Sequence, residues 1–327
     1  MSRRKVGKKM RIATHIGEPT DSKLRLARQM GLSDIVSGPP RAESGELPPV
    51  EEWERLRQKI ESHGLTLSVI ESIHLSDRAM LGQPGRDEDI QAFCQSVLHM
   101  GAADIPILCY GWAPTLNVLR TSRTRRVRGG ARATAYEHHL LENAPLTEVG
   151  EVSVEQLWES LDYFLEIVVP VAEEAGVRLA MHPNDPPISP IRGMARIMST
   201  PEDFQKLIDL VPSPNNGITF CQGCFAEMGV DLPETIRYFG EQDKIFFAHF
   251  RNIRGAVPSF YETFHDEGDT DMFAALKAYC DVGFDGPMRP DHYPAMEGEE
   301  PMEWQIKGRL FAVGYVKGLL EGVQKTK

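Results

Sequence analysis

Short runs of apolar residues alternate with longer amphipathic stretches along most of this chain. The short runs end in Gly, Pro or polar residues, a pattern that is typical of buried strands bounded by turns. The run at 179–182, for example, is followed by a cluster of prolines. We predict eight strands, over residues 10–15, 34–37, 65–72, 105–112, 179–182, 217–221, 244–249 and 287–291.

Stretches with apolar residues at helical spacing follow most of these strands. The longest covers 154–175 and has Leu157 and Leu161 on its apolar face, and Pro170 within it should bend or interrupt the helix. The sequence Thr-Pro-Glu at 200–202 indicates a helix start, because Pro fits the first turn. We predict helices over residues 21–30, 50–62, 87–100, 154–175, 232–239, 269–279 and 302–322, and one that begins at Pro201.

This alternation predicts the fold class. Strands that alternate with helices form a parallel sheet, because each helix returns the chain to the same end of the sheet. Eight such units favour an α/β fold of the closed (β/α)₈ type, a TIM barrel. The alternative is an open doubly wound sheet, but no Gly-rich phosphate-binding sequence follows the first strand.

Residues 113–152 interrupt the alternation after the fourth strand. They contain a basic, Gly-containing run, RTSRTRRVRGGARA, inside an acidic protein. Connections of this length are usually functional lids or disordered segments. We therefore predict one TIM-barrel domain over residues 1–327, in which 1–9 form a flexible basic tail and 113–152 an inserted loop or lid.

Composition and charge narrow the class of protein. The net charge is -11 and the isoelectric point is near 5.5, which argues against a nucleic-acid-binding protein. No apolar run approaches the ~18 residues that a membrane helix needs, and no apolar signal core follows the basic start. The five cysteines are scattered, so we expect reduced thiols and a cytoplasmic protein, although Cys221 and Cys224 form a C-x-x-C, a weak zinc or redox signal.

The last four predicted strands each end in a residue that can bind a metal: His182, Cys221, His249 and Asp291. Barrel active sites lie at the carboxyl ends of the strands, and these strands are neighbours around the ring. Taken singly, each residue has a structural explanation, such as a hydrogen-bonded histidine or a core cysteine. Together they predict a divalent ion that acts as a Lewis acid, and the cysteine alone would favour Zn²⁺.

Further polar residues surround these strand ends. We predict His292, Arg289 and His265 as catalytic residues. His292 suits a general acid or base, or a supporting or surface role. Arg289 suits a clamp on a carboxylate, or an ion pair with a neighbouring acid. His265 suits a substrate contact or an anchor for its loop. The predicted substrate-binding residues are Arg120, Arg251, Asn252 and Asp185, and a solvated side chain is the alternative for Arg120.

The sequences MHPNDPP, TFCQG, AHFRN, FHDEGDTDM and MRPDH, in this order and spacing, resemble the D-mannonate dehydratase family over about residues 10 to 320. The resemblance implies a barrel of the xylose-isomerase-like group, with metal ligands at His182, Cys221, His249 and Asp291. The catalytic histidine falls on His292. It also implies a divalent ion, Mn²⁺ in preference to Zn²⁺, Mg²⁺ or Co²⁺, and a homo-oligomer.

The implied reaction is the removal of water from D-mannonate, which gives 2-keto-3-deoxy-D-gluconate in hexuronate catabolism. The metal would polarise the substrate's carboxylate and adjacent hydroxyl, a base would take the proton next to the carboxylate, and an acid would protonate the departing C3 hydroxyl. The family's catalytic tyrosine falls on Trp304, which has no titratable proton, so Tyr293 or Tyr261 is the candidate substitute. The alternatives are a sugar isomerase or epimerase of the same barrel group and a non-catalytic sugar-acid binder.

Overall fold

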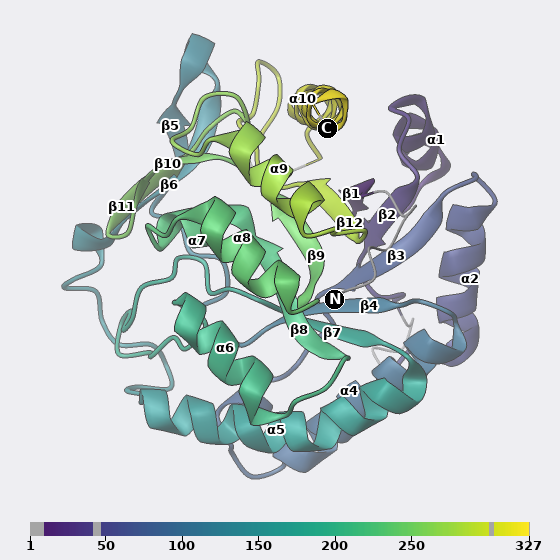
Figure 1. The fold of residues 1–327 in the computed structure, drawn as a ribbon. Helices are drawn as coiled ribbons and strands as arrows, with labels where there is room; N and C mark the ends of the chain where they lie inside the picture. The colour runs from purple at the N-terminus through teal and green to yellow at the C-terminus, as the bar shows by residue number, and fades with distance from the viewer. Residues whose placement is uncertain (1–9, 42–46, 301–303, 327) are drawn as a thin grey trace.

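Eight parallel strands close into a barrel in the order β1-β12-β9-β8-β7-β4-β3-β2 (Figure 1), so the predicted TIM-barrel fold is confirmed. The computed structural model describes residues 10–41, 47–300 and 304–326; the predicted tail at 1–9 lies outside them. The barrel strands are β1 (Arg11–Ile16), β2 (Asp34–Ser37), β3 (Thr66–Glu71), β4 (Ile107–Gly111), β7 (Arg178–His182), β8 (Asn216–Cys221), β9 (Ile245–Phe250) and β12 (Pro287–Pro290).

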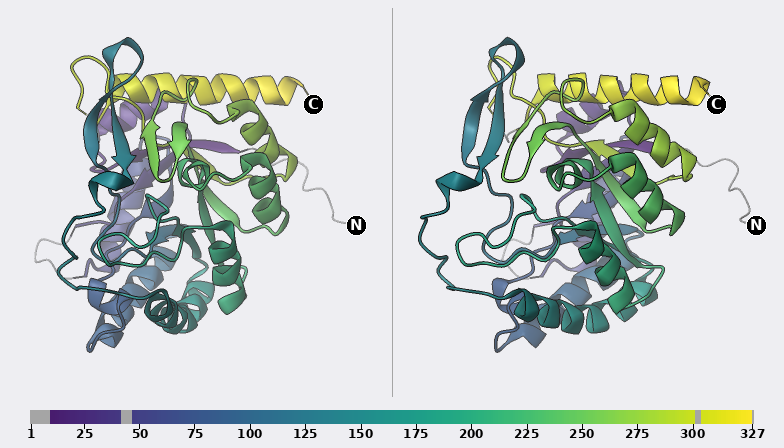
Figure 2. Two further views of the ribbon diagram at one scale, coloured as in Figure 1. Left: turned by 90° about the vertical axis from the view of Figure 1, so that its left-hand side faces the viewer. Right: turned by 60° about the vertical axis from the view of Figure 1, so that its left-hand side comes forward.

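Helices form the outer layer around these strands (Figures 1 and 2). Their apolar faces pack on the barrel, and the strands are buried on both sides as a parallel sheet requires. The helices that follow barrel strands are α1 (Asp21–Gln29), α2 (Val50–Glu61), α4 (Arg86–Ala102), α5 (Val154–Ala175), α6 (Pro201–Leu210), α8 (Leu232–Glu241), α9 (Met272–Asp281) and α10 (Ile306–Lys325), with the short α3 (Asp77–Met80) and α7 (Gln222–Glu227) between them.

Local sequence fixes several helix ends. Thr200 and Asp203 form a reciprocal capping box that starts α6 at Pro201, as predicted. Helix α5 runs through Pro170 without interruption. Helix α9 starts at Met272, and not at 269 as predicted, because the Asp271 carboxylate accepts the backbone N–H of residue 274 and caps the helix there. Helix α10 starts at Ile306; of the predicted first turn, 304–305 is not helical and 302–303 lies outside the described residues.

A second, antiparallel sheet was not predicted. Its order is β10-β11-β6-β5, and it consists of β5 (Ser122–Arg126), β6 (Arg132–Glu137), β10 (Ile253–Ala256) and β11 (Ser259–Glu262). The predicted insertion thus contains a hairpin, β5–β6, which pairs through β6 with a hairpin that follows β9. Both hairpins leave the barrel after the carboxyl end of a strand. Figure 2 shows β5–β6 projecting from the body of the molecule beside the start of α10.

The described core residues form three clusters, of which the smallest, Tyr136, Ile191, Ile253 and Phe260, lies at the second sheet. Most apolar side chains lie in one large cluster between strands and helices. A smaller cluster gathers side chains from six barrel strands, and includes Ala13, Val69 and Ala180. Packing on both faces fixes the directions of the strands. It therefore also fixes the positions of the side chains at and just after their carboxyl ends.

Candidate metal centre and active site

Consecutive barrel strands bring four metal-binding side chains to one place. His182 and Cys221 are the last residues of β7 and β8. His249 is the penultimate residue of β9, and Asp291 follows β12 directly. Cys221 and His249 are partners in the ladder between β8 and β9, so they lie at the same height in the barrel. The sequence alone predicted this convergence.

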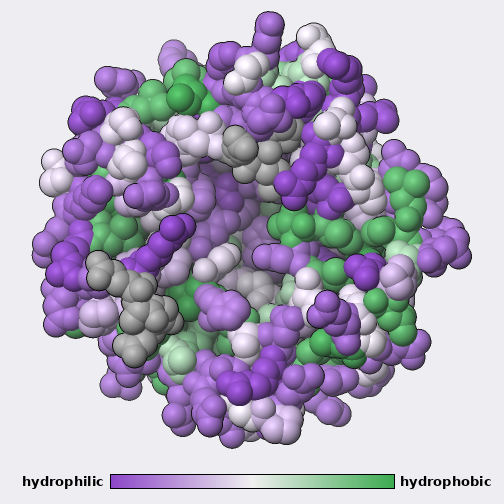
Figure 3. Space-filling model, turned by 180° about the vertical axis from the view of Figure 1, so that it is seen from behind, coloured by the Kyte–Doolittle hydropathy of each residue, from purple (hydrophilic) through white to green (hydrophobic). Residues whose placement is uncertain are grey.

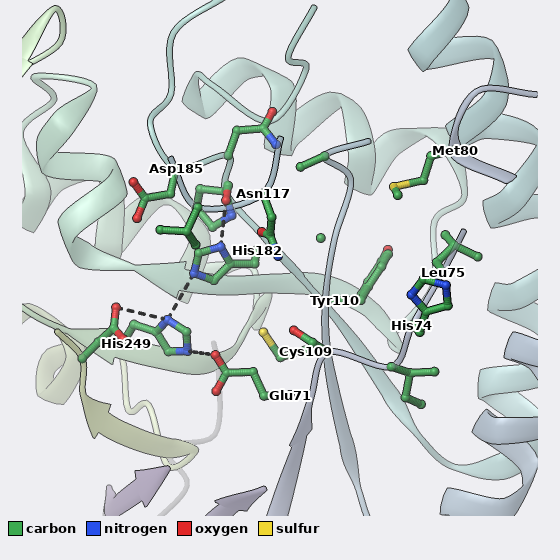
Figure 4. Close-up of a pocket in the computed structure, with 18 of the residues that line it drawn as sticks. Glu71, His74, Leu75, Met80, Cys109, Tyr110, Asn117, His182, Asp185 and His249 are labelled. Atoms are coloured by element: carbon green, nitrogen blue, oxygen red, sulfur yellow. Dashed lines mark hydrogen bonds and ion pairs between the residues drawn. The ribbon is translucent and has the colours of Figure 1, made fainter. Parts of the chain in front are cut away.

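The distances between the donor atoms are those of a metal site. His182 Nε2 lies 3.1 Å from His249 Nδ1, which lies 3.6 Å from Asp291 Oδ2. Cys221 Sγ is 3.8 Å from the same carboxylate oxygen. Donors bound ~2.0–2.3 Å from a tetrahedral ion lie roughly 3.3–3.8 Å apart. The donor atoms of Cys221, His249 and Asp291 all lie within 4.8 Å of one another, and His182 adjoins this group through His249, so the set suits a divalent ion. Figure 4 shows the two imidazoles facing one another.

The charges of these groups also suit a cation. Burial raises the pKa of the Cys221 thiol, but a hydrogen bond from Cys224 and the charge of Arg251 outweigh it and hold the pKa well below its ordinary value. Burial opposes charge on Asp291, yet Arg289 keeps the pKa of this carboxyl well below its usual range. The two side chains therefore offer a thiolate and a carboxylate, the forms that bind metals.

The histidines complete this set. Burial lowers the pKa of His249, and it would lower that of His182, but the negative Cys221 and Asp291 raise the His182 pKa to about 9. A divalent ion at the same place would compensate these negative charges instead of a proton on His182. The chemistry of the donors and their spacing thus both fit a metal ion, whose identity they leave open.

Glu71 supports two members of the site and was missed from the sequence. Its carboxylate lies 3.5 Å from His249 Nε2, on the ring edge away from His182 (Figure 4). Arg289 donates to Glu71 at 2.7 and 3.1 Å and to Asp291 at 2.6 Å. Of the two roles considered for Arg289, the structure contains the ion pair with neighbouring acids. A carboxylate next to a ligating histidine orients the ring.

His292 adopts a strained backbone conformation beside the metal ligands. Its φ angle is +31°, in the left-handed region that favours glycine. Its Nδ1 lies 2.6 Å from Arg251 Nη1 and 3.0 Å from Glu262 Oε1. Burial would lower its pKa, but Asp291 and Glu262 outweigh burial and raise it. These contacts fix one edge of the ring and leave Nε2 for other partners.

Arg251 belongs to a buried network of ionic groups. It is fully buried and lies 3.0 Å from Asp185, 2.7 Å from Glu227 and 2.9 Å from Glu262. Arg120 is paired with Asp185 and lies 2.7 Å from Glu262. The network joins the insertion, the loop after β7, α7, the end of β9 and β11. It therefore ties the second sheet to the barrel beside His292.

The other predicted site residues anchor a loop. Asn252 donates to the carbonyls of His265 and Thr270, and His265 Nε2 lies 2.7 Å from the carbonyl of Phe250. Both side chains are buried. For His265 this is the anchoring role that was the alternative to a substrate contact. Among the predicted substrate-binding residues, Asp185 lines a cavity next to the metal ligands, and a substrate contact by any of the four stays a prediction.

Two cavities meet at Asp291 and His292. One has a volume of about 340 Å³ and extends from the metal ligands toward Tyr110, Leu75 and Met80 (Figure 4). The other, of about 250 Å³, lies on the side of β1 and α10. A hydrophilic hollow is visible near the centre of the face in Figure 3. The space beside the metal ligands is therefore large enough and polar enough for a small polar molecule.

The three aromatic residues considered for the tyrosine role lie in different surroundings. The Arg309 guanidinium stacks on Trp304, with its central carbon Cζ 3.9 Å from the centre of the Trp304 ring. Tyr293 lines the smaller cavity, and burial raises its pKa to about 12. Tyr261 is on β11, against Arg125. Of the two candidate substitutes, Tyr293 is the one that lines a cavity at the site.

Comparisons with known proteins agree with this geometry. A family model described as D-mannonate dehydratase (UxuA) matches residues 9–151 and 146–327. "Mannonate dehydratase 2" of Halalkalibacterium halodurans is 36% identical in an alignment of 344 residues, gaps included. The alignment covers 96% of this chain and 99% of that one. A mannonate dehydratase of Thermotoga petrophila is 35% identical over 319 residues, 86% of this chain and 88% of its own.

Solved structures extend the comparison. The crystal structure of mannonate dehydratase from Streptococcus suis serotype 2 superposes with a TM-score of 0.90 at 30% identity, over 98% of this chain and 95% of that one. An L-ribulose 3-epimerase gives a TM-score of 0.63 at 15% identity, over 97% of each chain, which reflects the shared fold. Among the described residues, no helix has the length and apolar character to span a membrane. The chain belongs to the D-mannonate dehydratase (UxuA) family.

Proposed function

We propose that this protein is a metal-dependent hydro-lyase that removes water from D-mannonate to give 2-keto-3-deoxy-D-gluconate. The observation that carries the proposal is the convergence of His182, Cys221, His249 and Asp291 at consecutive strand ends in a chain of this family. We infer that these four side chains hold the metal. The adjoining cavity of about 340 Å³ exceeds the volume of a six-carbon sugar acid.

Mn²⁺ is the proposed ion, on the strength of the family resemblance, and the cysteine ligand also suits Zn²⁺. When bound, the ion supplies a Lewis acid that withdraws electron density from a substrate oxygen. The protein's own residues hold the carboxylates and imidazoles in place: Glu71 orients His249, and Arg289 holds Asp291.

His292 is the proposed proton-transfer residue. Its Nδ1 is engaged by Arg251 and Glu262, so the proton moves at Nε2, at the wall that the two cavities share. In the reaction, the C2–H bond breaks and its proton passes to a base. The C3–O bond breaks as the hydroxyl takes up a proton and leaves as water, and the resulting enol tautomerises to the keto acid. We assign Arg251 to positioning His292, because it is fully buried.

The remaining predicted residues act at a distance from the reacting atoms in this proposal. Arg120 and Asp185 hold the second sheet against the barrel, and Asn252 and His265 hold the loop after β9. A cytoplasmic location and a homo-oligomeric state remain predictions from the sequence.

The test is an incubation of the purified protein with D-mannonate and Mn²⁺, followed by mass spectrometry. The expected product has lost one water and carries a 2-keto group, and chelation of the metal abolishes its formation. An isomerised sugar acid without loss of water would favour an isomerase or epimerase. Tight binding of aldonates without turnover, in Mn²⁺, Zn²⁺, Mg²⁺ or Co²⁺, would favour a binding protein.

A further inference from the structure

The smaller cavity contains buried hydrogen-bond donors that have no partner. Gln305 is 4% exposed and Arg309 is 7% exposed, and both line this cavity of about 250 Å³. Within the part of the chain that the structure describes, neither Gln305 Nε2 nor Arg309 Nε has a hydrogen-bond partner. Buried donors are almost always satisfied, so a polar ligand that enters this cavity would supply partners that these two donors lack.

Among the described residues, Arg309 has no carboxylate within ion-pair distance, although the charge of Glu299 acts on it from farther away. Its guanidinium donates to Thr14 Oγ1 and to the carbonyl of His15, and it stacks on Trp304. Over residues 10–41, 47–300 and 304–326, no carboxylate lies within 4.0 Å of it. A buried cation without an anionic partner is costly, and an anion that enters the cavity would stabilise it.

The other arginines near His292 are already neutralised. Arg289 is paired with Glu71 and Asp291. Arg120 and Arg251 share the carboxyl groups of the buried network, Asp185, Glu227 and Glu262. Within the described ranges, Arg309 is therefore an arginine of this cavity that has no ion pair to give up to an incoming anion. The cavity shares Arg289, Asp291 and His292 with the larger one, so a ligand can extend across both.

We propose that the smaller cavity receives the carboxylate of the sugar acid, with Arg309 as its cationic partner and Gln305 as a neutral donor. This inference rests on the proposed function and adds the orientation of the substrate. The carbons next to the carboxylate then lie beside His292, at the wall between the cavities. The hydroxylated tail extends into the larger cavity, toward Tyr110. Trp304 is a positioning residue that holds the Arg309 guanidinium in its stack.

The experiment compares two ligands that differ in one charge, D-mannonate and its neutral amide, D-mannonamide. Dissociation constants are measured by calorimetry on metal-loaded protein, in a His292→Ala background that blocks turnover. Arg309→Met is expected to weaken binding of D-mannonate by about 10- to 100-fold, the usual effect of losing a charge-assisted hydrogen bond. It weakens binding of the amide by a much smaller factor, so the preference for the acid disappears.

Two further variants control for folding. Arg309→Lys keeps the charge and is expected to keep most of the preference for the acid. Gln305→Ala removes the second donor and leaves the stack of Arg309 on Trp304 in place. It is expected to weaken binding of D-mannonate by about 3- to 10-fold and binding of the amide by less. Lys317→Met, on the same helix but outside this cavity, loses the same charge and should change neither affinity. Thermal melting verifies that each variant is folded.

Three outcomes would overturn the inference. If Arg309→Met and Gln305→Ala keep the full preference for the acid, the carboxylate is held elsewhere, as at the metal. If both variants weaken binding of D-mannonate and of its amide by the same factor, the two residues support the structure of the cavity and do not bind the carboxylate. If the unsubstituted protein turns D-mannonate over and neither variant changes its affinity, the orientation is wrong while the proposed function stands. Binding of D-mannonate without any product in the unsubstituted protein removes the proposed reaction and leaves the subsite intact.

Discussion

Buried charges surround His292, and they determine which single substitutions the site tolerates. Two guanidiniums, Arg120 and Arg251, face three carboxyl groups. Burial and the nearby Asp185 raise the pKa of Glu227 well above its ordinary value. Burial also opposes charge on Glu262, but Arg251 and His292 outweigh it and lower the pKa. A proton on Glu227 would leave the network with two charges of each sign, and we expect this state because the pKa of Glu227 is raised.

This difference in pKa predicts that two Glu→Gln substitutions have very different effects on the free energy of unfolding. Glu227→Gln replaces a protonated carboxyl by a neutral group of the same shape, so it should change the free energy of unfolding by less than about 1 kcal/mol. Glu262→Gln removes a charge that two arginines and His292 share, and should cost about 3 kcal/mol. Urea unfolding of both variants at pH 7 measures the two values. Equal losses would contradict the assignment of the proton to Glu227.

The pH dependence of stability follows from the same assignment. The folded-state pKa of Glu227 is raised, so its contribution is fully present below the unfolded pKa and declines as the pH rises toward the folded value. Glu227→Gln lacks this titrating group, and its stability should therefore fall less than that of the unsubstituted protein as the pH rises above 4.5, the ordinary value for glutamate. Urea midpoints measured across this range test the sign, and parallel curves would rule it out.

Two histidine substitutions separate metal binding from proton transfer. His182→Ala removes a proposed ligand and should abolish metal binding and turnover together. His292→Ala keeps the four proposed ligands, so it should retain the metal and lose activity by about 10²- to 10⁴-fold, the usual contribution of an acid or base. Elemental analysis of the dialysed proteins and the keto-acid assay give both readouts. Full activity of the second variant would remove His292 from the reaction.

At the scale of single residues, the sequence predicts candidate metal ligands better than it predicts the residues that hold them in place. His182, Cys221, His249 and Asp291 were predicted as metal ligands because each stands at the end of a predicted strand, and their role stays a prediction. Glu71 and Arg289 are 218 positions apart, and no local pattern indicates that they pair. The same holds for Glu227 and Glu262, whose partner Arg251 meets them through α7 and β11. Long-range ionic contacts depend on the closed barrel, which a linear pattern does not contain.

At the scale of elements, burial decides what can be predicted. The eight barrel strands are mostly buried, and most of them are rich in apolar residues, so they stand out as runs. Strand β5 has the sequence SRTRR and is exposed along most of its length, and its sheet is completed by strands more than a hundred residues later. Strand periodicity cannot indicate such a pairing. Helix α7 was missed because its six residues follow β8 without a loop.

Helix α7 offers a prediction about close packing. A Cβ atom on Gly223 would lie 1.6 Å from Arg251 Nε, so only glycine fits beside this guanidinium. Gly223→Ala should displace Arg251, destabilise the protein by about 3 kcal/mol and reduce activity, because His292 loses a partner. Gly314→Ala is the matched control: its Cβ would meet nothing within 4 Å, and in the middle of α10 it should stabilise by about 0.5–1 kcal/mol. Thermal melts and the keto-acid assay compare the two, and a harmless Gly223→Ala would mean that Arg251 is mobile.

At the scale of the whole molecule, the proposed metal ligands connect parts of the barrel that are far apart in sequence. They come from the ends of β7, β8 and β9 and from the residue after β12. The buried ionic network then links this edge to the second sheet. The pairing of β12 with β9 brings Asp291 next to His249, while the pairing of β1 with β12 closes the barrel that the count of β–α units predicted.

Metal binding should therefore stabilise the entire barrel. An ion that binds only the folded protein adds RT ln(1 + [M]/Kd), about 2.7 kcal/mol at a hundredfold excess over Kd. Removal of the metal by a chelator should lower the melting temperature by several degrees, and added Mn²⁺ should restore it. In His182→Ala, chelator and Mn²⁺ should both leave the melting temperature unchanged. Because the four ligands belong to one cooperative unit, circular dichroism and tryptophan fluorescence should report the same shift. A shift that persists in His182→Ala would place the stabilising ion at another site.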